Sequence, residues 1–168
     1  MKLLFLDVDG VLNYDMCGVK VGPYYGVVPE KVKFLKQIID ATGAKIVLSS
    51  SWRRDINIGT PLENQTSPFA VELISKLEGE GLHIYDVTSV EGKEHLRKAQ
   101  IEDLIHEYRR CGQPVSHWAV LDDYMFDGYD DPDFEPHVVY TNFYGSGLTE
   151  KEVAETIAIL NAEVGESG

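Results

Sequence analysis

Apolar runs and amphipathic stretches alternate along the chain. Short apolar runs typical of buried strands cover residues 2–6, 44–52, 82–87, 117–123 and 137–141. Stretches with apolar residues at helical spacing cover residues 29–41, 67–81, 94–112 and 149–163. Strands that are apolar throughout and are separated by helices are typical of a parallel sheet covered on both faces. The pattern therefore predicts a three-layer α/β fold with five main strands flanked by helices.

Residues at the ends of the amphipathic stretches support their assignment as helices. Pro29 suits the first turn of the first helix, and Gly43 suits its end. Ser67 can cap the second helix, and Thr149 with Glu152 has the spacing of a capping box at the start of the last one. Local sequence and hydrophobic pattern thus predict the same elements.

Composition narrows the class of protein. With 168 residues the chain is expected to form a single domain, residues 1–168. Cys17 and Cys111 lie too far apart in sequence to indicate a disulfide framework or a zinc motif. Asp7 interrupts the opening apolar run too early for a secretory core or a membrane span, so we expect a cytoplasmic protein without membrane contact. A net charge of −13 disfavours binding of extended nucleic acid but is compatible with a nucleic-acid end as a substrate.

Polar side chains follow directly after three of the predicted strands. Asp7, Ser49 and Asp122 each come after an apolar run. Parallel sheets place their sites at the carboxyl ends of strands, so we expect these residues to share one edge of the sheet. Asp7 and Asp9 are two residues apart and can face the same side of an extended segment. Clustered carboxylates suit a hard cation such as Mg²⁺, which prefers oxygen ligands.

The motifs, taken in order, resemble those of haloacid dehalogenase (HAD) superfamily phosphohydrolases. They are Asp7-Val8-Asp9-Gly10-Val11, then Ser49, then Arg97 or Lys98, then Asp122-Asp123 with Asp127. The stretches LSSSWR, LDD and GLT further resemble the HAD domain of RNA-repair ("Swiss army knife") proteins. The resemblance implies a Rossmann-like fold and a Mg²⁺-dependent phosphatase.

The resemblance also implies roles for the acidic residues. Asp7 would attack phosphorus and form an aspartyl-phosphate, while Asp9 would exchange protons with the leaving oxygen and with water. The metal would take the Asp7 carboxylate, the Asp9 main-chain carbonyl and a late carboxylate. Asp123 is the first choice for that last ligand because Asp123 and Asp127 have the family's spacing, and Asp122 is the alternative.

Phosphate contacts follow from the same pattern. Ser49 would hold a phosphoryl oxygen, with Ser50 next to it. A cation is needed beside Asp7. The family pattern of an Arg four residues before an Ile favours Arg97 over Lys98 for this role, and Lys93 remains a third candidate. Gly10 allows the backbone to turn closely around the ligand, and Arg53 could face the substrate or stack on Trp52.

The spacing between motifs bears on the substrate. The stretch from Asn13 to Val28 is only 16 residues long, enough for a flap carrying Tyr24 and Tyr25, and no cap domain fits after Trp52. An open site suits a bulky phosphorylated substrate, such as a nucleic-acid end, a nucleotide or a phosphoprotein. The alternative is an oligomer in which a partner subunit closes the site. A phosphotransferase or phosphomutase, and a non-catalytic regulatory phosphate-binding module, are the alternatives.

Overall fold

The computed structural model describes residues 1–91 and 96–164, and its centre is a parallel sheet. In spatial order the strands are β5 (Ile84–Val87), β4 (Lys45–Leu48), β1 (Lys2–Leu6), β6 (His117–Asp122) and β7 (Val138–Tyr140). Every neighbouring pair in this sheet is parallel. The predicted α/β fold with a parallel sheet is confirmed, and β1 lies at its middle.

The helices begin and end close to the predicted residues. They are α1 (Pro29–Thr42), α2 (Pro68–Glu78), α3 (Arg97–Arg110) and α4 (Glu150–Leu160). Gly43 ends α1 with a left-handed φ of 68°, and the Ser67 hydroxyl accepts a hydrogen bond from the Phe69 N–H at the start of α2. Thr149 and Glu152 form the capping box. None of the helices in the described ranges has the length and apolar character to cross a bilayer.

One boundary differs from the prediction. The strand expected over 44–52 ends at Leu48, and Ser51–Asp55 forms the 3₁₀ helix η1. The Ser50 hydroxyl accepts a hydrogen bond from the Trp52 N–H at 3.2 Å and so caps η1. Serine side chains that bond nearby backbone N–H groups favour caps over strands.

Helices cover the two faces of the sheet unequally. Side chains alternate along β1, so Leu4 and Leu6 pack with α1, α2 and α4, whereas Leu3 and Phe5 pack with α3. The segment after β6 completes the α3 face with Tyr129. Burial on both faces explains the nearly continuous apolar sequence of β1.

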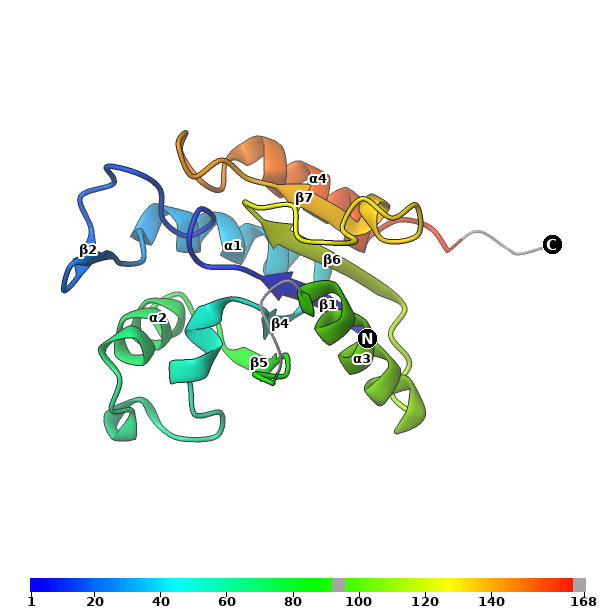
Figure 1. Ribbon diagram of the computed structural model, residues 1–168, viewed down its shortest axis with the longest axis horizontal. Helices are drawn as coiled ribbons and strands as arrows, with labels where there is room; N and C mark the ends of the chain where they lie inside the picture. Colours follow the sequence, from blue (N-terminus) through cyan, green and yellow to red (C-terminus); the bar gives the residue numbers. More distant parts are fainter. Residues whose placement is uncertain (92–95, 165–168) are drawn as a thin grey trace.

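A small hairpin forms the predicted flap between Asn13 and Val28. Its strands, β2 (Lys20–Val21) and β3 (Tyr24–Tyr25), are antiparallel. Figure 1 shows the hairpin projecting at the left, next to α2 and far from the amino-terminus. Glu72 of α2 accepts a hydrogen bond from the Val27 N–H at 3.0 Å, and Lys76 donates to the Val27 carbonyl at 2.6 Å. The hairpin base is therefore attached to α2 by partly buried polar contacts.

Candidate active site

Three of the predicted site residues lie where the sheet ends. The ladder of backbone bonds continues just beyond the strands: the Asp7 N–H donates to Leu121 O at 3.0 Å, and the Ser49 N–H donates to Leu6 O at 3.0 Å. On the other side, Asp122 O accepts from the Thr141 N–H at 2.9 Å. These bonds bring Asp7, Ser49 and Asp122 to one edge, the placement expected for the carboxyl ends of parallel strands.

A group of three carboxylates occupies this edge. Asp7, Asp122 and Asp123 can each offer an oxygen that lies within 4.8 Å of the others. Asp7 and Asp122 are buried, and Asp123 is half-buried. Arg97, at the first turn of α3, places Nη1 3.6 Å from Asp7 Oδ1 and 3.1 Å from Asp122 Oδ2. We call these four residues the carboxylate centre.

The carboxylate centre holds more negative than positive charge. The pKa of the Asp7 carboxyl is raised well above its ordinary value. Burial is the largest cause, the negative charge of Asp122 is the next, and Arg97 opposes the rise. Burial also raises the pKa of Asp122, again against the effect of Arg97. A hard cation would relieve this repulsion, and an all-oxygen set of carboxylates is the ligand type that Mg²⁺ prefers. The residues present therefore fit a magnesium ion.

Neighbouring groups hold Asp122 and Arg97 in place. The Tyr129 hydroxyl donates to Asp122 Oδ2 at 3.2 Å, and the Tyr124 N–H donates to Oδ1 at 3.1 Å. Beneath Arg97, the Phe126 ring centroid lies 3.9 Å from the guanidinium carbon. The segment that follows β6 thus supplies both polar and aromatic support.

Lys98 does not belong to the carboxylate centre, although the sequence left it as an alternative to Arg97. Its ammonium pairs with Glu102 and lies 3.4 Å from Asp131 Oδ2. Successive helical residues point about 100° apart, so Arg97 and Lys98 cannot face the same site. Lys93, the third candidate, lies outside the described residues.

The two serines differ in their hydrogen bonding. Ser49 is fully buried, and its hydroxyl has no hydrogen-bond partner among the residues that the structure describes. An unmet buried hydroxyl costs free energy, so this position fits contact with a ligand oxygen. Ser50 is also buried, but its hydroxyl serves as the cap of η1.

Asp9 is exposed beside the carboxylate centre, and its carboxylate is oriented by two side chains. The Trp52 indole N–H donates to Oδ2 at 3.1 Å, and the Asn13 amide donates to Oδ1 at 2.9 Å. Asn13 is buried and also accepts from the Gly10 N–H at 3.0 Å. Sequence reasoning did not identify Asn13 or this function of Trp52. A polar side chain two residues after the apolar Val11, inside the first loop, was the available signal for Asn13.

Gly10 is required by a close contact. Its φ is +81°, and a Cβ placed there would lie 2.3 Å from Asp123 Oδ2. Any side chain at this position would therefore displace Asp123 as well as strain the backbone. The close neighbour of Gly10 is thus a protein carboxylate, and its predicted turn around a ligand stays a prediction.

The prediction that Arg53 faces the substrate does not fit the structure. Arg53 is 1 % exposed, and its guanidinium donates to the carbonyls of Ser49, Ser50 and Ser89. It also donates to Gln100 Oε1 at 3.2 Å. Arg53 therefore ties together the segments that follow β4 and β5 and the helix α3.

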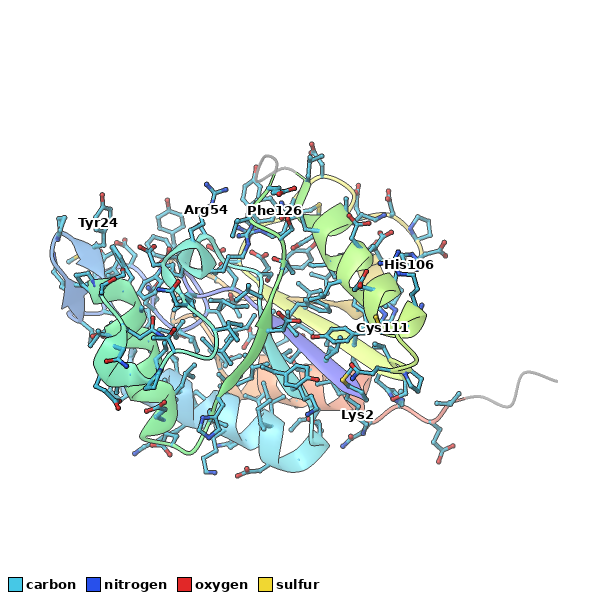
Figure 2. The ribbon with its side chains drawn as sticks, turned by 90° about the horizontal axis from the view of Figure 1, so that it is seen from below. Lys2, Tyr24, Arg54, His106, Cys111 and Phe126 are labelled. Carbon is cyan, nitrogen blue, oxygen red and sulfur yellow. The ribbon has the colours of Figure 1, made fainter. Side chains whose placement is uncertain are left out.

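Asp127 does not join the carboxylate group that the structure brings together. It is exposed on the segment after β6, whereas the grouped oxygens come from Asp7, Asp122 and Asp123. Figure 2 shows Phe126 of this segment along the same edge as Arg54 and Tyr24, far from Lys2 at the start of β1. The edge that carries the carboxylate centre thus continues toward the hairpin.

Comparison with known proteins gives one match. A family model described as "HAD domain in Swiss Army Knife RNA repair proteins" matches residues 3–153, which include every residue of the site described above. Neither the curated proteins nor the solved structures contain a significant match to the chain.

Proposed function

The chain belongs to this family of HAD domains, and we propose that it is a Mg²⁺-dependent phosphomonoesterase with Asp7 as the nucleophile. The family indicates a phosphatase or hydrolase type of activity. The observation that supports the specific proposal is the carboxylate centre, which puts a buried Asp7 beside two further carboxylates and one guanidinium.

The proposed reaction has two steps. In the first, an Asp7 oxygen attacks phosphorus, the bond from phosphorus to the leaving oxygen breaks, and Asp9 gives that oxygen a proton. In the second, Asp9 takes a proton from water, and the water oxygen attacks phosphorus. The aspartyl-phosphate bond then breaks, which releases phosphate and restores Asp7.

The surrounding groups of this chain support both steps. Trp52 and Asn13 donate to the two oxygens of the Asp9 carboxylate and so hold it in one orientation. Arg97 stabilises negative charge near Asp7, and the Ser49 hydroxyl can donate to a phosphoryl oxygen. Asp7, Asp122 and Asp123, with the main-chain carbonyl of Asp9, would hold the Mg²⁺ ion. When bound, this ion supplies positive charge that offsets the repulsion between phosphate and carboxylates.

We propose a bulky phosphomonoester as the substrate. The insertion after the first motif is a hairpin of two short strands, which lines the site and leaves it accessible to a large molecule. The family description refers to RNA repair proteins, in agreement with a phosphorylated nucleic-acid end. The net charge of −13 disfavours contact with a long stretch of nucleic acid.

The test is hydrolysis of p-nitrophenyl phosphate by the purified chain. We expect activity with Mg²⁺, its loss in excess chelator and its return when Mg²⁺ is added back. Asp122→Asn should raise the Mg²⁺ concentration needed for half-maximal activity, while Asp130→Asn, which removes an exposed carboxylate from the same acidic segment, should not. Full activity in chelator would contradict the metal assignment, and no activity under any of these conditions would contradict the proposed function.

A further inference from the structure

A cleft lies beside Asp9, on the side toward the hairpin. Its volume is about 460 Å³, and it is lined by the aromatic side chains of Tyr24, Tyr25, Trp52, Phe69 and Phe143. Asp9 itself forms part of the wall. We call this hollow the aromatic cleft; Figure 2 shows Tyr24 at the hairpin end of the edge that also carries Arg54.

Contacts among the rings fix the walls of the aromatic cleft. The centroids of Trp52 and Phe69 lie 5.1 Å apart with their planes at 75°, and those of Tyr24 and Phe69 lie 5.6 Å apart. On the other side, the Tyr25 and Phe143 centroids lie 5.8 Å apart. Because these rings come from the hairpin, η1, α2 and the segment after β7, the cleft exists before any ligand binds, which lowers the ordering cost of binding.

The polar lining of the aromatic cleft is acidic. Besides Asp9, the polar side chains in the wall include Asp55 and Ser51, and no lysine or arginine from residues 1–91 and 96–164 lines it. A second phosphate would be repelled here. A neutral, planar group with hydrogen-bond donors fits better, since its faces can stack on the rings and its donors can reach the carboxylates.

We propose that the aromatic cleft binds the nucleoside of the phosphomonoester, free or at the end of a strand, while its phosphate lies at the carboxylate centre. This inference rests on the proposed function. Asp9 is the link, because it lines the cleft and is the proposed proton donor to the leaving oxygen, so the cleft lies on the leaving-group side. Stacking of a base on aromatic rings supplies binding without reading sequence.

The lining favours a nucleoside over the other aromatic phosphoester, phosphotyrosine. The ring of phosphotyrosine carries no hydrogen-bond donor once its oxygen bears the phosphate, so Asp55 would face an apolar edge. Amino groups of bases and hydroxyls of ribose can donate to that carboxylate. A sugar phosphate has the hydroxyls but offers no planar face to the rings.

The first experiment compares kcat/KM among substrates. For at least one of adenosine 5′-monophosphate and adenosine 3′-monophosphate, kcat/KM should exceed that for ribose 5-phosphate by at least about 10-fold, the size of effect expected from base stacking. An oligonucleotide with the corresponding terminal phosphate distinguishes a strand end from a free nucleotide as the source of the nucleoside. Equal kcat/KM for ribose 5-phosphate and both nucleotides would overturn the proposal, as would a preference for a phosphotyrosine peptide.

Matched tyrosine variants locate the effect. Tyr24 is 62 % exposed in the wall of the cleft, and Tyr144 is 84 % exposed next to Phe143 but outside that wall. Tyr24→Ala should reduce the preference for the nucleotide over ribose 5-phosphate by about 5- to 10-fold. Tyr144→Ala should leave the preference as it is in the unmodified protein. Equal effects of the two variants would overturn the assignment of the cleft.

A binding measurement separates this inference from the proposed function. The chain has two tryptophans, so Trp118→Phe leaves Trp52 as the fluorescent reporter of the cleft. Unphosphorylated adenosine should quench this fluorescence with saturation, and Tyr24→Ala should weaken the effect. Saturable quenching without hydrolysis of any phosphoester supports the cleft and contradicts the phosphatase. Hydrolysis without saturable quenching supports the phosphatase and contradicts the assignment of the cleft.

Discussion

The carboxylate centre and the aromatic cleft meet at Asp9, yet they are built in different ways. Backbone bonds between strands position Asp7 and Asp122, and burial shields them. The cleft depends on contacts between side chains of loops and short elements, and it opens to solvent. The sheet thus fixes the groups of the proposed reaction, and the loops shape what can reach them. Changes in the centre should act on kcat and folding, whereas changes in the cleft should act on selectivity.

The largest effect is expected from Asp7→Asn. This change removes the proposed nucleophile and leaves a side chain of the same shape, so turnover should fall by at least about 10⁴-fold while the protein stays folded. The measurements are kcat with p-nitrophenyl phosphate and the melting temperature. Mass spectrometry of the unmodified protein after rapid quenching should find phosphate on Asp7, and phosphate on any other residue would contradict the mechanism.

Asp9→Asn should have a smaller effect on the same reaction. Loss of proton transfer typically lowers the rate by about 10²- to 10⁴-fold, while the nucleophile remains. Nitrophenolate needs little help in leaving, so one equivalent should appear quickly before a slow phase. Asp55→Asn removes the other carboxylate of the cleft and should lower kcat far less. A larger loss in Asp55→Asn than in Asp9→Asn would reverse the roles of the two residues.

Adjacent cations on α3 offer a test of which one serves the carboxylate centre. Arg97→Met leaves Asp7 and Asp122 buried without their guanidinium, so the free energy of unfolding should fall by about 3 kcal/mol. Lys98→Met removes a partly exposed ion pair, which should cost less than about 1 kcal/mol. Urea denaturation of both variants measures the difference, and equal losses would contradict the distinction between them.

Trp52→Phe addresses the connection between the two regions and should have the smallest effect. The ring stays in the cleft, but the N–H bond to Asp9 is lost, so kcat should fall by about 10-fold with KM for a nucleoside monophosphate nearly unchanged. Trp118→Phe is the control. A rise in KM with unchanged kcat would mean that Trp52 only contacts the substrate in the aromatic cleft and does not act through Asp9.

The sequence was sufficient for the fold and for the edge that carries the site. Continuous apolar strands separated by amphipathic helices have few alternatives to a covered parallel sheet, and Asp7, Ser49 and Asp122 each follow such a strand. Their side chains share an edge because the strands run in the same direction. The spacing of apolar residues and the order of strands and helices along the chain were thus enough for this part of the prediction.

Residues in loops were harder to place from sequence. Arg97 and Lys98 are neighbours in the chain, and only the start and rotation of α3 decide which one reaches Asp7. Arg53 follows an apolar tryptophan next to the site, but its burial depends on carbonyls far along the chain, such as that of Ser89. The contact of Trp52 with Asp9 spans 43 residues and has no periodic signal. Tertiary contacts of this kind are not encoded in local pattern.

The backbone ladder that extends past β1 also bears on how the protein opens. Asp7 is joined to β6 by the same kind of bond that holds the middle of the sheet, so its amide should exchange with solvent deuterium only when the whole domain unfolds. Within the part of the chain that the structure describes, β2 and β3 pair only with each other, through Lys20 with Tyr25 and Val21 with Tyr24, so their amides should exchange through local opening. The hairpin should therefore open on a shorter timescale than the backbone that holds Asp7, which keeps its position until the domain unfolds.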